Sequence, residues 1–202
     1  MSPTWYHMDL KTAFLQGEAY DETRDIICQI PPEYGYQPYI GARLKKPGYG
    51  LNDAPRRWWQ IIDKALLDCG LVPTRADRCT YVLYDSTSKT KTYQPPRSVN
   101  TEQVTISEAI DHLMDPVARN NAQGRRPHGF ICLHVDDLFM AGDKVFESKV
   151  LSSLRKNFAV GSEDKNDIMF VGQRIKWKTH DKYGPYISVD QKLAVDAVEE
   201  VK

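Results

Sequence analysis

Two adjacent aspartates, Asp136 and Asp137, are the residues of this sequence best suited to chemistry, because they stand between two apolar segments. Their surroundings in residues 130–142 are rich in Ile, Leu, Val and Phe, which predicts a β-strand on each side of an acidic turn. Ionised carboxylates in an apolar setting need a partner or a metal ion, and hard oxygen ligands suit Mg²⁺. The alternative is an Asp-rich β-turn at the protein surface.

A third carboxylate, Asp9, ends a short apolar segment near the N-terminus. The residues that follow, Leu10, Ala13 and Phe14, have helical spacing. A metal-binding Asp at the carboxyl end of a strand is typical of phosphoryl-transfer sites, where metal ions neutralise charge. Asp9 could instead cap a helix, but a cap does not explain its combination with Asp136.

Four segments of the chain, taken in order, resemble the motifs of a reverse transcriptase of the copia type of long-terminal-repeat retrotransposon. They are residues 9–17, 44–58, 135–137 and 170–172. The resemblance runs from about residue 5 to about residue 85 and resumes from residue 129 to about residue 192. It implies an α+β fold of the polymerase-palm type: an antiparallel sheet with helices packed on one face, part of the fingers and the start of a thumb.

The resemblance further implies RNA-directed DNA polymerase activity, by two-metal-ion nucleotidyl transfer to a primer 3′-hydroxyl. Asp9, Asp136 and Asp137 would be the catalytic carboxylates. Together with the main-chain carbonyl of Leu10, they would hold two Mg²⁺ ions, for which Mn²⁺ is a possible substitute. Phe14 matches the family's steric gate, an aromatic ring that excludes a ribose 2′-hydroxyl. Phe14 could also be a core aromatic residue.

Residues 48–55 resemble the family's nucleotide and template grip, and the resemblance assigns Tyr49 and Gly50 to nucleotide binding. Glycine allows the backbone to approach a ligand closely. Basic side chains on both sides could contact template phosphates, which give sequence-independent affinity. These are Lys45, Lys46, Arg56 and Arg57. The alternative is that these basic side chains only form a solvent-exposed face and bind no phosphate.

Residues 168–175 are expected to form a short strand that resembles the family's primer grip, with Val171 and Gly172 guiding the primer end. Two amphipathic helices are also predicted, over residues 55–69 and 144–158. The first carries Trp58, Ile61 or Ile62, Ala65 and Cys69 at helical spacing and ends at Gly70. The second would be capped by Asp143 and would pack beneath the sheet through Phe146, Val150, Leu151, Leu154 and Phe158.

The predicted organisation has four parts: the first part of the palm and fingers (1–85), an insertion (86–128), the catalytic hairpin, helix and primer-grip strand (129–192), and the start of a thumb (193–202). The insertion has no counterpart in the family. Its capping-box pattern, Thr105 to Glu108, predicts one helix reaching Val117, and a polar linker follows over residues 120–127. This helix could bind a partner, or it could be an exposed insertion without a binding role.

The composition narrows the possible function classes. With 202 residues, 41% of them hydrophobic, the chain can bury a substantial core. Its net charge is zero, whereas a stand-alone nucleic-acid-binding domain is usually basic. The four cysteines and five histidines lack zinc-ligand spacing, and no apolar run could span a bilayer or serve as a signal peptide. We therefore expect no membrane association and no secretion, and a cytoplasmic (virus-like particle) or nuclear location.

The partners that the resemblance implies are an RNA template, a DNA primer, deoxynucleoside triphosphates and the rest of a polyprotein, with integrase and ribonuclease H. Two departures from the family favour an alternative, namely an inactive remnant or a co-opted domain that binds nucleic acid or protein. His134 stands where the family usually has an aromatic residue, and only eight residues precede Asp9, so most of the fingers region is expected to be missing. The presence of all three aspartates and Phe14 favours the enzyme.

Overall fold

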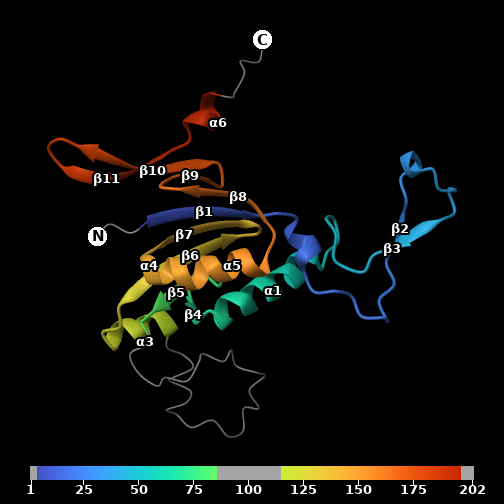
Figure 1. The fold of residues 1–202 in the computed structure, drawn as a ribbon, viewed down its shortest axis with the longest axis horizontal. Coiled ribbons are helices and arrows are strands. Elements are labelled where there is room, and N and C mark those ends of the chain that lie inside the picture. Colours follow the sequence, from blue (N-terminus) through green and yellow to red (C-terminus); the bar gives the residue numbers. More distant parts are fainter. Residues whose placement is uncertain (1–3, 86–114, 197–202) are drawn as a thin grey trace, which may run out of the picture. The chain divides into compact units, whose positions relative to one another are not determined.

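The computed structural model describes residues 4–85 and 115–196 (Figure 1). The chain forms two compact units. We call the first the sheet unit, made of Met1–Lys11 and Leu66–Lys202, and the second the small unit, made of Thr12–Ala65. The predicted α+β class with antiparallel sheets is confirmed. Within the described ranges, no helix is long and apolar enough to cross a membrane.

A six-stranded antiparallel sheet, in the order β4-β5-β6-β7-β1-β8, is the centre of the sheet unit (Figure 1). Its strands are β4 (Leu71–Pro73), β5 (Thr80–Tyr84), β6 (Pro127–His134), β7 (Asp137–Gly142), β1 (Thr4–Leu10) and β8 (Val160–Lys165). Strand β1, from the beginning of the chain, therefore lies between two strands that come after residue 136.

The two faces of this sheet differ in character because successive side chains of a strand point to opposite sides. On β1, Tyr6, Met8 and Leu10 are buried, and their neighbours on β6 and β7 that share this face, among them Ile131 and Met140, are buried too. We call this the core face. The opposite face of β1 carries His7 and Asp9, and we call it the acidic face.

The segment after β7 confirms the predicted helix over residues 144–158. It consists of α4 (Lys144–Phe146), a π-helical turn (Glu147–Leu151) and α5 (Ser152–Asn157). Asp143 caps it as predicted, since its carboxylate accepts hydrogen bonds from the N–H groups of Val145 (2.9 Å) and Phe146 (3.1 Å). All five predicted apolar residues are buried. Phe146 lies against β6 and β7 where Gly129 and Gly142 leave room for its ring.

A second antiparallel sheet of the sheet unit has the order β11-β10-β9, with β9 (Asp167–Phe170), β10 (Gln173–His180) and β11 (Gly184–Asp190). The prediction of one strand over residues 168–175 is therefore wrong. The chain reverses at Val171 and Gly172, whose φ angles of 48° and 74° are those of a type I′ hairpin turn. Val171 disfavours such a turn, which is why the pattern indicated a continuous strand.

Two short helices complete the sheet unit. Helix α3 (Pro116–Ala122) precedes β6, so residues 120–122, expected in a polar linker, are helical. The insertion helix predicted to begin at Thr105 lies outside the described residues as far as residue 114. Helix α6 (Lys192–Asp196) begins one residue before the segment expected to start a thumb and continues into it.

The small unit contains the short 3₁₀ helices η1 (Ala13–Gln16) and η2 (Pro32–Tyr34), and the antiparallel pair of β2 (Ile27–Gln29) and β3 (Gly41–Arg43). It also contains most of α1 (Ala54–Asp68), which agrees with the helix predicted over residues 55–69. Trp58 and Ile62 are buried, so Ile62 and not Ile61 belongs to the buried stripe. Gly70 follows with a φ of 83°, as expected of a helix stop.

The close approach of Phe146 to Gly142 gives a testable prediction for stability. A Cβ atom on Gly142 would lie 2.4 Å from Cγ and 2.6 Å from Cβ of Phe146. Gly142→Ala should therefore lower the free energy of unfolding by about 1–3 kcal/mol, as overpacking does, measured by denaturant unfolding. The matched control is Gly48→Ala, where the nearest atom is 3.8 Å away. Equal stability of the two variants would contradict the prediction.

Candidate active site

The pairing of β1 with β7 brings the predicted catalytic carboxylates to one end of the six-stranded sheet. Asp9 is directly opposite Asp137 in this antiparallel pair. The N–H of Leu10 donates a hydrogen bond of 2.9 Å to the main-chain oxygen of Asp136. Asp9 thus lies next to the Asp136–Asp137 pair, although these residues are far apart in the sequence.

The turn between β6 and β7 is shifted by one residue from the prediction. Its two central residues are Val135 and Asp136, whereas Asp137 begins β7 opposite His134. Val135 has a φ of 58°, as the first central residue of a type II′ turn does. This conformation is rare for a β-branched residue, and strained residues of this kind cluster at functional sites. The turn presents Asp136 at its tip and keeps Asp137 within the sheet.

The pKa of Asp9 reflects both its burial and its acidic neighbours. Burial raises the pKa of the Asp9 carboxyl group above its ordinary value, and the charges of Asp136 and Asp137 raise this pKa further, while His7 acts in the opposite direction. Among the residues that the structure describes, neither Asp9 nor Asp136 forms an ion pair with a basic side chain. A cation would therefore relieve the repulsion between them.

These carboxylates have the donor chemistry that Mg²⁺ and Mn²⁺ prefer, since both ions favour hard oxygen ligands. In residues 4–85 and 115–196, however, no three Asp, Glu, His or Cys side chains converge on one point as metal ligands do. The carboxylate of Asp137 is hydrogen-bonded to His7. The donor chemistry therefore suits a divalent cation, while the described side chains do not converge as a complete ligand set.

Gly161 on β8 makes room for the Asp9 carboxylate. The register of β1 and β8 passes from Asp9–Ser162 to Leu10–Val160, so Gly161 is the extra residue of a β-bulge. A Cβ atom on Gly161 would lie 2.2 Å from Oδ2 and 3.4 Å from Cγ of Asp9. Bulges often occur beside active sites, where they redirect a side chain. Here the bulge leaves the space that the carboxylate occupies.

His7 is a second residue that the sequence analysis missed. Its side chain is 9% exposed, and its Nε2 atom lies 3.0 Å from Oδ1 of Asp137. Strand alternation could have identified it, because a residue two positions before Asp9 shares the acidic face. For Gly161 the sequence offers no signal, since its role depends on pairing between distant strands.

In the small unit, the predicted nucleotide-binding residues lie together. The rings of Phe14 and Tyr49 have centroids 4.8 Å apart at an angle of 53°. Tyr49 is 62% exposed, whereas Phe14 is half-buried. Gly50 has a φ of 88°, a conformation that favours glycine. The two rings form one partly exposed aromatic surface next to a glycine with positive φ.

The predicted template-binding basic residues divide into two groups. Three of them are exposed: Lys45, Lys46 and Arg56. Arg57 instead donates from Nε to Oδ2 of Asp53 at 2.9 Å, and its guanidinium lies 4.6 Å from the centroid of the Tyr20 ring. Arg57 is therefore held within the small unit, which makes it a weaker candidate for binding phosphate than the other three.

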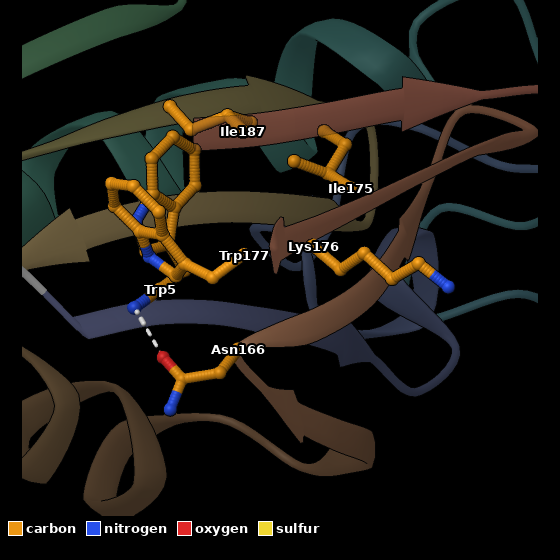
Figure 2. Close-up of a pocket in the computed structure, with 6 residues that line it drawn as sticks. All are labelled: Trp5, Asn166, Ile175, Lys176, Trp177 and Ile187. Carbon is orange, nitrogen blue, oxygen red and sulfur yellow. Dashed lines mark hydrogen bonds between the residues drawn. The ribbon is translucent and has the colours of Figure 1, made fainter. Parts of the chain in front are cut away.

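The hairpin of β9 and β10, which carries the predicted primer-grip residues, packs on the acidic face. The ring of Phe170 lies 5.6 Å from that of Phe139 on β7, and Trp177 lies edge-on to Trp5 at 5.8 Å. Figure 2 shows the two indoles together, with the main-chain N–H of Trp5 donating to Oδ1 of Asn166 at 3.3 Å. At the tip of the hairpin, Val171 is 50% exposed, and Gly172 completes the turn.

The raised pKa of Asp9 predicts that this residue lowers stability at neutral pH. The folded protein holds the Asp9 proton more tightly than the unfolded chain, so the free energy of unfolding falls as the pH rises through the folded-state pKa. Asp9→Asn cannot ionise and should therefore be more stable than the wild type at pH 7. This gain should vanish below about pH 3, where Asp9 is protonated in both states.

Thermal unfolding between pH 3 and pH 7 measures this effect, and Asp167→Asn is the matched control. Hydrogen bonds from Arg174 lower the pKa of the Asp167 carboxyl group, so that substitution should decrease stability at pH 7. A shift of the same sign in both variants would contradict the assignment for Asp9.

Comparison with known proteins finds one matching family and several partial relatives. Residues 3–91 match the family described as reverse transcriptase (RNA-dependent DNA polymerase). A retrovirus-related Pol polyprotein from transposon TNT 1-94 of Nicotiana tabacum is 33% identical over 76 residues, which are 37% of this chain and 6% of the relative. Those from transposons RE2 and RE1 of Arabidopsis thaliana are 36% and 35% identical over 78 residues, 38% of this chain and 5% of each relative.

The chain therefore spans only about a twentieth of the length of these relatives. The family match includes Asp9, Phe14 and the basic residues from 45 to 57, and it ends before Asp136. No solved structure is significantly similar to the chain.

Proposed function

We propose, from the confirmed similarity to reverse transcriptases of copia-type retrotransposons, that this chain is part of the palm of an RNA-directed DNA polymerase. The observation that carries the proposal is the β1–β7 pairing, which sets Asp9 opposite Asp137 and beside the Asp136 turn. Asp9 lies inside the family match, and the pairing adds two carboxylates from beyond it. The proposed reaction is nucleotidyl transfer to a primer 3′-hydroxyl.

In this proposal Asp9 and Asp136, with the Leu10 carbonyl, hold Mg²⁺ or Mn²⁺. Such ions would neutralise the triphosphate charge and make the primer hydroxyl a better nucleophile. The chain itself contributes two carboxylates that lack a basic partner among its described residues, one at the end of a paired strand and one on a two-residue turn. Positioning, together with electrostatic stabilisation by the bound ions, supplies most of the rate enhancement in phosphoryl transfer.

The small unit would supply substrate selection. Phe14, whose ring contacts Tyr49, would exclude a ribose 2′-hydroxyl by volume, and Gly50 would let the backbone approach the nucleotide. The exposed residues Lys45, Lys46 and Arg56 would bind template phosphates, and Val171 and Gly172 would guide the primer. Integrase and ribonuclease H segments of the polyprotein would be the further partners.

Primer extension on an RNA template, with Mg²⁺ and deoxynucleotides, tests this function. We expect extension by the wild type, and a loss of at least about 100-fold in Asp136→Asn, because that change removes a carboxylate from the proposed ion site. The control is Asp181→Asn, which changes an exposed carboxylate in the β10–β11 turn and should leave extension unchanged. The same assay should be repeated with fingers and thumb regions of a relative joined to the chain.

If neither form extends a primer, or if Asp136→Asn extends as fast as the wild type, the polymerase proposal is wrong. The chain would then be a remnant or a co-opted binding domain. Binding of an RNA–DNA duplex without extension would support the co-opted domain.

The close approach of Gly161 to Asp9 gives a second prediction. Gly161→Ala would push the Asp9 carboxylate away from its present position, because the new methyl group would overlap Oδ2. We expect kcat for primer extension to fall by about 10–100-fold, since small displacements of a reacting group have effects of this size. Binding of the RNA–DNA duplex should be retained.

Gly142→Ala is the matched control, because it adds a methyl group to a similarly crowded position of the same sheet, next to Phe146 and not next to Asp9. Its folded fraction should extend primers at the wild-type rate. Equal kcat values for the two variants would show that Gly161 does not position Asp9.

A further inference from the structure

We infer that residues 31–34 are a docking site for a protein partner with a proline-binding aromatic groove, namely a WW domain of the class that binds Pro-Pro-x-Tyr peptides. The four residues are Pro31, Pro32, Glu33 and Tyr34, and we call them the diproline motif. This inference goes beyond the proposed polymerase function and does not depend on it.

The diproline motif lies in the connection between β2 and β3 of the small unit (Figure 1). The two strands are antiparallel, with Ile27 opposite Arg43 and Gln29 opposite Gly41, so the connection leaves and returns at one end of the pair. All residues from 31 to 43 are exposed. A partner can therefore reach the motif without any rearrangement of the small unit.

The side chain of Tyr34 is not used for packing within the chain. It is 72% exposed, and its hydroxyl group forms no hydrogen bond with any residue that the structure describes. A tyrosine ring combines a large apolar surface with a polar tip, which is why tyrosine is common at protein interfaces. Most of this ring surface is available to a partner.

The charges of the connection favour a protein partner over a nucleic acid. From residue 26 to residue 42, Glu33 is the only charged side chain. Affinity for nucleic acid comes mainly from Lys and Arg beside the phosphates, whereas a carboxylate in the middle of the segment would repel them. An aromatic groove instead binds proline through ring contacts, for which the segment needs no charge.

The backbone of the motif begins in the conformation that such a groove binds. Pro31 has φ and ψ angles of −56° and 140°, which are those of polyproline II. The ring of Pro32 also fixes its φ angle near −65°. Two consecutive prolines thus leave little backbone freedom to be lost on binding, and this lowers the entropic cost of association.

The 3₁₀ turn η2 that follows Pro31 keeps the two contact residues on one side. The N–H of Tyr34 donates to the main-chain oxygen of Pro31 at 3.1 Å, and that of Gly35 to Pro32 at 2.9 Å. The 3₁₀ helix and polyproline II both have three residues per turn, so Pro31 and Tyr34 share a side in either conformation. Extension of this exposed turn in a groove requires mainly changes in ψ, because the φ angles are similar.

Titration calorimetry of the full 202-residue chain with a purified WW domain that binds Pro-Pro-x-Tyr peptides tests the inference. We expect saturable one-to-one binding by the wild type. Pro32→Ala and Tyr34→Ala should each weaken it by at least about 10-fold, because each removes a ring that fills a pocket of the partner. Circular dichroism should show both variants folded, since both side chains are exposed.

Tyr39→Ala is the matched control, because Tyr39 is 84% exposed in the same connection but lies outside the motif. Its affinity, and that of Glu33→Ala, should stay within about twofold of the wild type, since neither side chain is expected to fill a pocket of the groove. A WW domain whose groove tryptophan is replaced by alanine should bind none of these chains.

The inference is overturned if the wild type does not bind the WW domain, or if Tyr34→Ala and Tyr39→Ala bind equally well. Titration with oligouridine tests the other class of partner: binding that depends on Tyr34, without binding of the WW domain, would make the connection a nucleic-acid surface instead. Binding of the WW domain by a chain that does not extend primers would support the inference and reject the polymerase proposal. The two can therefore fail separately.

Discussion

The antiparallel pairing of β1 with β7 is the constraint on which the rest of the site depends. It places Asp9 directly opposite Asp137, and directly opposed residues have Cβ atoms only about 4.5–5.5 Å apart. Like charges in this position repel each other, so the pairing is stable only if other contacts hold the strands together. The core face supplies them, because Tyr6, Met8 and Leu10 of β1 are all buried. Apolar packing on the core face thus holds the two strands together despite the repulsion between carboxylates on the acidic face.

Three unusual features of the molecule lie close to this pairing. Val135 has a left-handed backbone, Asp9 has a raised pKa, and Gly161 forms a bulge that leaves space for one carboxylate. Local strain and unneutralised charge of this kind are common at functional sites, where the surrounding structure maintains them. The predicted stability gain of Asp9→Asn has the same cause, because the ionised Asp9 carboxylate lowers the free energy of unfolding at neutral pH.

The parts of the fold that depend on local pattern could be predicted from the sequence. The helix after Asp143 has its cap and all five buried residues where the spacing placed them, because capping and helical periodicity are properties of a short segment. The turn at Val171 was missed and the acidic turn was predicted one residue too late, since a β-branched residue with positive φ gives no turn signal. The roles of His7 and Gly161 depend on the register between distant strands, which no local pattern encodes.

Register also explains why the site and the core cannot vary independently. A slip of β1 by one residue would turn Tyr6, Met8 and Leu10 toward the acidic face and would bury His7 and Asp9 in the core, because side chains alternate with a period of two. The three apolar residues therefore determine which way Asp9 points and whether His7 can reach Asp137. It follows that substitutions at Met8, which does not lie on the acidic face, can disturb the acidic group through the register alone. The geometry of the carboxylates is in this sense a property of the core packing of β1.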